Sequence, residues 1–169
     1  MRISFGFCTS DWWVSRVIRW FTRAKCSHAF LLLEGTQLGD LVLEAEWCGL
    51  KLSTRSALTR GTTRIVDLIE VPPSMYPAVY AATMKALSGA LDTPYDYVGL
   101  VGMAWVAFCR WFGKKRRNPL RSAKSMFCSD AMVALILQPA GWPGADTLDA
   151  QSIDPEAERI FLHTSLPPS

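Results

Sequence analysis

Three short segments hold residue types that can together perform nucleophilic chemistry. His28 opens the apolar run that follows Ser27, Glu44 lies inside the strand-like segment LVLEAEW, and Cys128 belongs to the segment FCSD at 127–130, where an apolar helix is expected to begin. A thiol at a helix N-terminus and beside an imidazole loses its proton readily, because both stabilise the thiolate. The sequence therefore predicts a nucleophile (Cys128), a base (His28) and an orienting carboxylate (Glu44) of a cysteine-dependent hydrolase or acyltransferase.

Position alone offers two candidates for the carboxylate. Strand alternation places Glu44 and Glu46 on one face of their strand. A carboxylate on an apolar strand needs a partner, and a hydrogen bond to the His28 ring would supply one and fix its tautomer. Glu44 is preferred because Leu43 and Ala45 bracket it, whereas Glu46 lies closer to the strand end, and Glu46 stays open as an alternative.

The elements that must position these residues follow from hydrophobic periodicity and from breaks at Pro and Gly. Strands are expected at 3–7, 28–34, 41–47 and 64–71, the second and third of them forming an antiparallel hairpin. Helices are expected at about 13–21, 74–91, 97–112 and 128–137, with a basic loop at 113–124. From about residue 138 we expect a loop-rich tail with one short strand at 159–163. The fold class predicted is α+β, an antiparallel sheet packed against helices, in a single domain over residues 1–169.

Composition limits the setting and the chemistry. The N-terminus lacks the pattern of a secretory signal, so we expect a cytoplasmic protein. The five cysteines are odd in number and irregularly spaced, which argues against a disulfide framework and a zinc site and favours reduced thiols. We expect no metal and no cofactor.

Basic and aromatic residues raise the question of anionic partners. Between Asp96 and Asp130 there is no acid, although seven Lys and Arg residues fall there, and a solvated basic loop is the preferred interpretation. The helix at about 13–21 carries apolar residues at helical spacing and could lie on an anionic membrane, but packing on the core is preferred. The uncharged apolar stretch 98–109 is shorter than the roughly 20 residues that span a bilayer. No nucleic-acid motif is present, so no specific nucleic-acid partner is expected.

The order of the segments resembles a known family. An amphipathic helix runs into Ser27-His28, the pair Glu44-Ala45 is followed by a Gly and Leu-Lys-Leu, TPYDYVGLVG occupies 93–102, and FCSD occupies 127–130. In these features the chain resembles the circularly permuted, YiiX-like branch of the NlpC-type cysteine peptidases, whose His precedes the Cys. The likeness covers most of residues 10–137.

The resemblance implies a papain-like fold and a Cys-His-Glu triad of Cys128, His28 and Glu44. It also implies that Tyr95 or Tyr97 lines the site, with Ser27 beside the substrate. One departure concerns Asp130, where the family commonly has Glu, and it affects the hydrogen bonding at the helix start. The helix expected at 98–112 is more hydrophobic than a typical cell-wall peptidase requires. This indicates a lipid-like or membrane-proximal substrate, as in the related lecithin:retinol acyltransferase-like branch.

Three functions compete on this basis. The leading one is a thiol hydrolase that cleaves an amide, in a peptide or a peptidoglycan-type substrate, through an acyl-enzyme at Cys128. The second is a lipid acyltransferase or thioesterase-like enzyme with the same triad. The third is a catalytically silent module that binds a membrane or another anionic surface. The oligomeric state is not predicted. If His163 rather than His28 approached Cys128, the permuted assignment would be wrong.

Overall fold

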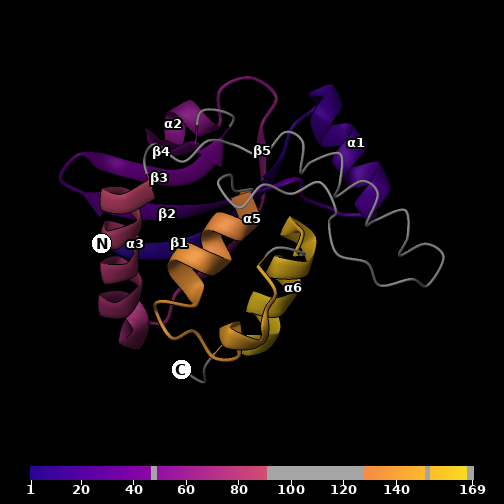
Figure 1. The fold of residues 1–169 in the computed structure, drawn as a ribbon. Helices are drawn as coiled ribbons and strands as arrows, with labels where there is room; N and C mark the ends of the chain where they lie inside the picture. Colours follow the sequence, from indigo (N-terminus) through magenta and orange to yellow (C-terminus); the bar gives the residue numbers. More distant parts are fainter. Residues whose placement is uncertain (47–48, 91–127, 151–152, 167–169) are drawn as a thin grey trace.

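The fold is α+β and is built on one antiparallel sheet (Figure 1). The computed structural model describes residues 1–46, 49–90, 128–150 and 153–166. Its strands are β1 (Arg2–Thr9), β2 (His28–Thr36), β3 (Gly39–Glu46), β4 (Gly49–Thr54) and β5 (Arg64–Glu70), in the spatial order β4-β3-β2-β1-β5. Every neighbouring pair is antiparallel, so the predicted hairpin of β2 and β3 is confirmed. Strand β4 was not predicted, because it is short and follows β3 after two residues.

The helices are distributed around this sheet and vary in length. They are α1 (Trp13–Thr22), α2 (Arg55–Leu58), α3 (Tyr76–Ala90), α5 (Cys128–Ala131) and α6 (Pro155–Ser165). A 3₁₀ turn, η1 (Pro73–Met75), precedes α3; a π-helical segment, η2 (Met132–Leu137), continues α5; and a second 3₁₀ turn, η3 (Ala145–Thr147), follows. The predicted helix at 97–112 and basic loop at 113–124 lie outside the described residues. None of the described helices has the length and apolar character needed to cross a membrane.

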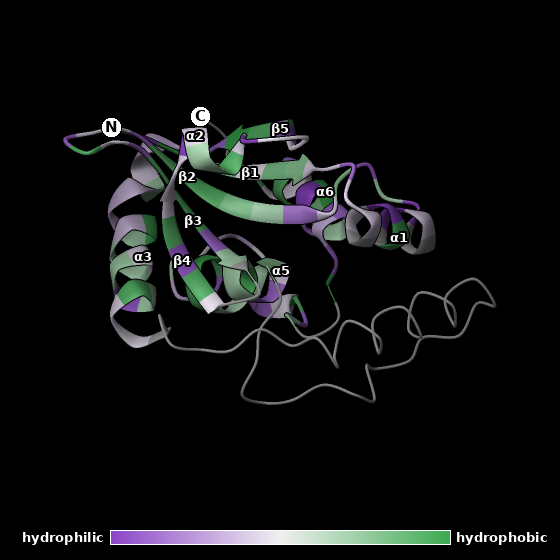
Figure 2. Cartoon of the chain, turned by 90° about the horizontal axis from the view of Figure 1, so that it is seen from above, coloured by the Kyte–Doolittle hydropathy of each residue, from purple (hydrophilic) through white to green (hydrophobic). Residues whose placement is uncertain are grey.

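The main core lies between one face of the sheet and the helices α3, α5–η2 and α6 (Figures 1 and 2). Strand alternation directs Phe5, Leu31 and Leu43 to this face, where they pack with helix residues such as Met132 and Leu162. A smaller cluster on the opposite face contains Cys8, Phe30, Leu32 and Val42, with Leu58 of α2 against it. The sheet is therefore apolar on both faces, and a buried carboxylate within it needs specific partners.

Gly6 is required by the close approach of Phe30 on the smaller cluster's face. The two residues are paired in register between β1 and β2, and a Cβ at Gly6 would lie 2.2 Å from the Phe30 ring. That overlap could be relieved only by moving a fully buried aromatic ring. Phe30 is also the register partner of Glu44, so this contact holds the strand that carries the predicted triad carboxylate.

The predicted strand at 159–163 is wrong, because these residues belong to helix α6. The helix is capped by Asp154, whose carboxylate accepts a hydrogen bond from the Ala157 N–H at 2.8 Å, and Pro155 occupies its first turn. The consecutive apolar residues 160–162 imitate a strand in the sequence, but only Leu162 of the three is fully buried. The chain beyond residue 138 is thus less loop-rich than expected.

Helix α1 is confirmed in extent, but part of the apolar side that was expected to face the core is exposed. Trp13 and Val17, two of the five residues expected to face the core, are exposed. The side chains of the other three lie outside the described residues. Among the residues of this helix whose side chains are described, the small polar Ser15 is the buried one, and its hydroxyl contacts those of Thr9 and Ser27.

Candidate active site

The antiparallel pairing of β2 and β3 places His28 next to Glu44. Phe30 is opposite Glu44 in the register, and His28, two residues earlier, points to the same face. The diagonal neighbours are joined by a contact of 2.9 Å between His28 Nε2 and Glu44 Oε2. Glu44 is 2% exposed, whereas the His28 side chain is 23% exposed. The carboxylate therefore lies behind the ring, and the ring is the more accessible of the two groups.

Strand β4 completes the surroundings of the Glu44 carboxylate. The Ser53 hydroxyl donates a hydrogen bond of 3.0 Å to Glu44 Oε1, and Lys51 is directly opposite Glu44 in the register. Burial by itself would raise the pKa of Glu44, but hydrogen bonds from His28 and Ser53 and the charges of His28 and Lys51 together lower it. Neither Ser53 nor Lys51 was identified from the sequence. Recognition of the alternating Leu50-Lys51-Leu52-Ser53 as a strand would have found both.

Cys128 begins helix α5, which packs against β2 and β3. The thiol is 5% exposed, and it makes a side-chain hydrogen bond with His28. Backbone N–H groups of Ala29 and Ser129 also donate to the sulfur. The Ser129 hydroxyl in turn donates to the Ile153 carbonyl at 3.0 Å, which ties the start of α5 to the chain before α6.

The electrostatics of this arrangement favour an ion pair. Burial disfavours the thiolate, but the charge and hydrogen bond of His28, with the two backbone N–H donors, outweigh it and lower the pKa of Cys128. Burial likewise disfavours the imidazolium, but Cys128 and the Glu44 hydrogen bond raise the pKa of His28 well above its ordinary value. The two directions together stabilise a thiolate next to an imidazolium, the reactive form of a cysteine nucleophile.

The other described thiols have the opposite character. Cys8 and Cys26 are free and buried like Cys128. Burial raises the pKa of Cys8 to about 11 despite the opposing charge of His28. Burial and a hydrogen bond to Glu156 raise the pKa of Cys26 well above its usual range. Burial is common to all three thiols, so the imidazole and backbone donors around Cys128 account for the difference.

The second histidine lies away from the thiol. His163 on α6 is 46% exposed, and its Nε2 lies 2.7 Å from Asp67 Oδ2 on β5. Arg159 donates to the same oxygen of Asp67 at 2.9 Å. The alternative in which His163 serves Cys128 therefore has no support in this geometry.

The remaining predicted site residues differ in what the structure says of them. Ser27 is buried, and its hydroxyl is hydrogen-bonded to that of Ser15 on α1; it joins α1 to the residue before the imidazole. Tyr95 and Tyr97 lie outside the described residues. Glu46 ends β3, and its side chain lies outside the described residues. The structure therefore places the Glu44 carboxylate at the His28 ring but gives no position of the Glu46 carboxylate to compare with it.

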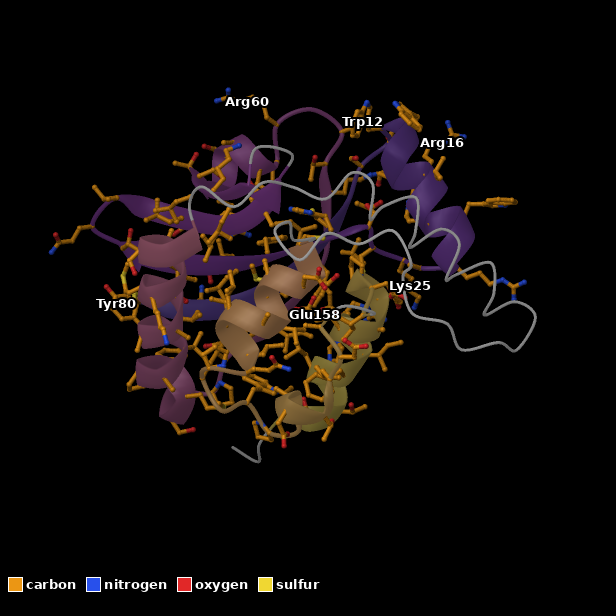
Figure 3. All side chains as sticks on the ribbon, viewed as in Figure 1. Trp12, Arg16, Lys25, Arg60, Tyr80 and Glu158 are labelled. Carbon is orange, nitrogen blue, oxygen red and sulfur yellow. The ribbon has the colours of Figure 1, made fainter. Side chains whose placement is uncertain are left out.

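A second buried glutamate near the site was missed by the sequence analysis. Glu158 on α6 is fully buried, and neither of its carboxylate oxygens has a hydrogen-bond partner within the described structure (Figure 3). Burial raises its pKa well above the ordinary value, and the negative charges of Cys128, Asp130 and Asp154 add to this, against the charge of His28. The buried environment of Glu158 thus favours its protonated form. The expectation of a loop or strand at this position concealed it.

Comparison with protein-family models, with curated proteins and with solved structures finds no match for this chain. Within the described ranges, no group of three or more His, Cys, Asp and Glu side chains is arranged to hold a metal ion. The functional argument therefore depends on the geometry of Cys128, His28 and Glu44.

Proposed function

We propose that the chain is a thiol hydrolase that cleaves an amide bond, in a peptide or peptidoglycan-type substrate, with Cys128 as nucleophile, His28 as acid and base, and Glu44 as the orienting residue. The observation that carries the proposal is a single imidazole held by Glu44 at 2.9 Å and hydrogen-bonded to a thiol of lowered pKa at a helix start. The order of His before Cys supports a permuted papain-like arrangement.

The proposed acylation begins with attack of the Cys128 thiolate on the substrate carbonyl carbon. A carbon–sulfur bond forms, and the carbonyl electrons move to oxygen to give a tetrahedral intermediate. When the carbonyl re-forms, the carbon–nitrogen bond breaks, and the His28 imidazolium gives its proton to the leaving nitrogen. The amine product departs, and a thioester to Cys128 remains with a neutral His28.

Deacylation reverses the role of the imidazole. Neutral His28 accepts a proton from a water molecule as the water oxygen attacks the thioester carbonyl, and the carbon–sulfur bond breaks. The carboxylic acid product and the Cys128 thiolate–His28 imidazolium pair are the result. Glu44 holds the ring in one tautomer and stabilises the imidazolium without itself accepting a proton.

The test is alkylation of the native protein with iodoacetamide over a range of pH, with each cysteine followed by peptide mass spectrometry. Cys128 should react near neutral pH at least about tenfold faster than Cys8 and Cys26, since each unit of pKa separates thiolate populations tenfold. Cys8 is the matched control, because it is equally buried and lies near the same imidazole. His28→Ala should abolish the advantage of Cys128, and equal rates in the native protein would refute the proposal.

A second candidate is a lipid acyltransferase or thioesterase-like enzyme with the same three residues. The observation that favours it is the exposed tryptophan-rich surface of α1, which leads directly into the His28 segment. Screening of the alkylation-competent protein with amide, ester and thioester substrates separates the two, because they share the nucleophile and differ in the bond broken. An alkylation-competent protein that turns over none of these classes would favour the silent binding module instead.

A further inference from the structure

Helix α1 presents aromatic residues to solvent and a small polar residue to the body of the protein. Trp13, Arg16, Val17 and Trp20 are spaced as i, i+3, i+4 and i+7, so they share one side of the helix, and all four are exposed. Ser15 lies on the opposite side and is buried. An exposed side that carries two tryptophans and a valine is unusual for a surface helix, whose exposed side is ordinarily polar.

The exposed side of α1 is extended by its neighbour Trp12. Trp12 and Trp13 are 63% and 66% exposed, and their rings contact each other at a centroid distance of 6.0 Å. Figure 3 shows Trp12 and Arg16 projecting away from the rest of the molecule. Large apolar side chains gathered in this way on a surface indicate an interaction site. We call Trp12, Trp13, Arg16, Val17 and Trp20 the α1 surface.

The charge of this region has one sign. From residue 12 to residue 33 the sequence contains Arg and Lys residues but no acid. The nearest preceding acid, Asp11, is already paired with Arg64 at 3.0 Å. Arg16 has no ion pair within the described part of the chain and is exposed. A surface of tryptophans with basic neighbours matches the interface of an anionic bilayer, where indole rings lie at headgroup depth and Arg meets lipid phosphate and carboxylate.

We propose that the α1 surface docks the protein on an anionic lipid bilayer. A second copy of the chain fits this surface less well, because a two-fold contact would bring two basic surfaces together without acids to pair them. A nucleic acid offers phosphates but no apolar layer to receive Val17. The bilayer interface offers both components in one plane.

The position of α1 connects this docking surface to the proposed active site. Five residues separate the end of α1 from His28, and the Ser15 hydroxyl is bonded to that of Ser27, immediately before the imidazole. Docking therefore holds the His28 end of β2 near the lipid surface. The consequence for catalysis rests on the proposed function. A Cys128 nucleophile held near the bilayer would meet acyl groups of membrane lipids or amide substrates anchored at the membrane.

The experiment is co-sedimentation of the full chain with phosphatidylserine–phosphatidylcholine vesicles and with pure phosphatidylcholine vesicles, at low and high salt. The wild type should bind the phosphatidylserine-containing vesicles, and binding should weaken as salt rises. Arg16→Glu and Trp13→Ala should each reduce the partition coefficient about tenfold. Cys128→Ser should bind as the wild type does, so loss of docking and loss of catalysis are separate results.

Matched controls come from α3, which lies at the opposite end of the molecule from α1 in both views (Figures 1 and 2). Lys85→Glu reverses an exposed charge there, and Tyr80→Ala removes an exposed aromatic ring. Both should bind as the wild type does. Equal binding to the two vesicle types, no binding, wild-type binding by both α1 variants, or a dimer that Trp13→Ala dissociates would each overturn the proposal.

Discussion

Two glutamates are buried near His28, and their pKa values are shifted in opposite directions. Glu44 on β3 has His28 on one oxygen and Ser53 on the other, and its pKa is lowered. Glu158 on α6 has no hydrogen-bond partner in the described structure, and its pKa is raised. Burial acts on both in the same direction, so the partners decide the charge. The comparison teaches that only one of the two carboxylates can stabilise an imidazolium.

The largest expected effect is a difference in turnover between the Glu44→Gln and Glu158→Gln variants. Glu44→Gln removes the charge that orients His28 and stabilises its imidazolium, and turnover of a substrate found by screening should fall about 10²- to 10⁴-fold. Glu158→Gln replaces a buried acid of raised pKa by a neutral amide of similar shape, and turnover should change only a few-fold. Steady-state kinetics of both variants checks this, and a larger loss for Glu158→Gln would reverse the assignment.

Replacement of each acid by leucine tests the same comparison through stability. Glu44→Leu leaves the His28 ring and the Ser53 hydroxyl without their partner, and the free energy of unfolding should fall by about 3–5 kcal/mol. Glu158→Leu removes a buried polar group that has no hydrogen-bond partner in the described structure, and stability should be unchanged or increased. Urea denaturation measures both. Equal losses of stability in the two variants would mean that Glu158 has a partner that stabilises the fold as much as the partners of Glu44 do.

The pH dependence of stability should have opposite signs for the two residues. Burial raises the folded-state pKa of Glu158, so its contribution is complete below the unfolded-state pKa and is lost as pH rises toward the raised folded-state value, at up to about 1.4 kcal/mol per pH unit. The Glu44 contribution is present above the unfolded-state pKa and is lost as pH falls through the lowered value. Denaturation curves between acid and neutral pH, with Glu158→Gln and Glu44→Gln as references, check this.

For Glu158→Gln, the decline in stability above the ordinary glutamate pKa should be smaller than in the wild type. An unchanged profile would show that Glu158 is ionised in the folded protein. For Glu44→Gln, the acid-side loss should be smaller, because one group that must be protonated has been removed.

The smallest expected effect concerns the partner that the sequence analysis missed. Ser53→Ala removes one neutral donor to the Glu44 carboxylate while the His28 contact remains, and stability should fall by about 1–2 kcal/mol. Thr54→Ala, at the next residue, removes an exposed cap of the short helix α2 and serves as the comparison for a hydroxyl outside the site. If Ser53→Ala neither raised the pKa of Glu44 nor lowered the free energy of unfolding, the hydroxyl would have no electrostatic role.

The strands and helices nearest the predicted triad were largely accessible from the sequence. Alternation indicated β2, β3 and β5, and the pattern before Pro139 indicated a helix from Cys128. Residues of one hairpin are close in sequence, so the approach of His28 to Glu44 follows from pairing alone. Strand β4 and helix α6 were missed, because a six-residue strand and three consecutive apolar residues in a helix give weak or misleading periodicity.

By itself, the sequence determined the chemical identities: one histidine at a strand start, acids on the next strand, a thiol at a helix start, and an aromatic basic helix before them. Only the tertiary structure decided which buried acid has hydrogen-bond partners and a lowered pKa, that Ala29 and Ser129 donate to the sulfur, and that α1 turns Trp13 and Val17 outward. The reason is physical. Residue type and spacing report local periodicity, whereas a pKa or an exposed face depends on groups that packing brings from distant parts of the chain.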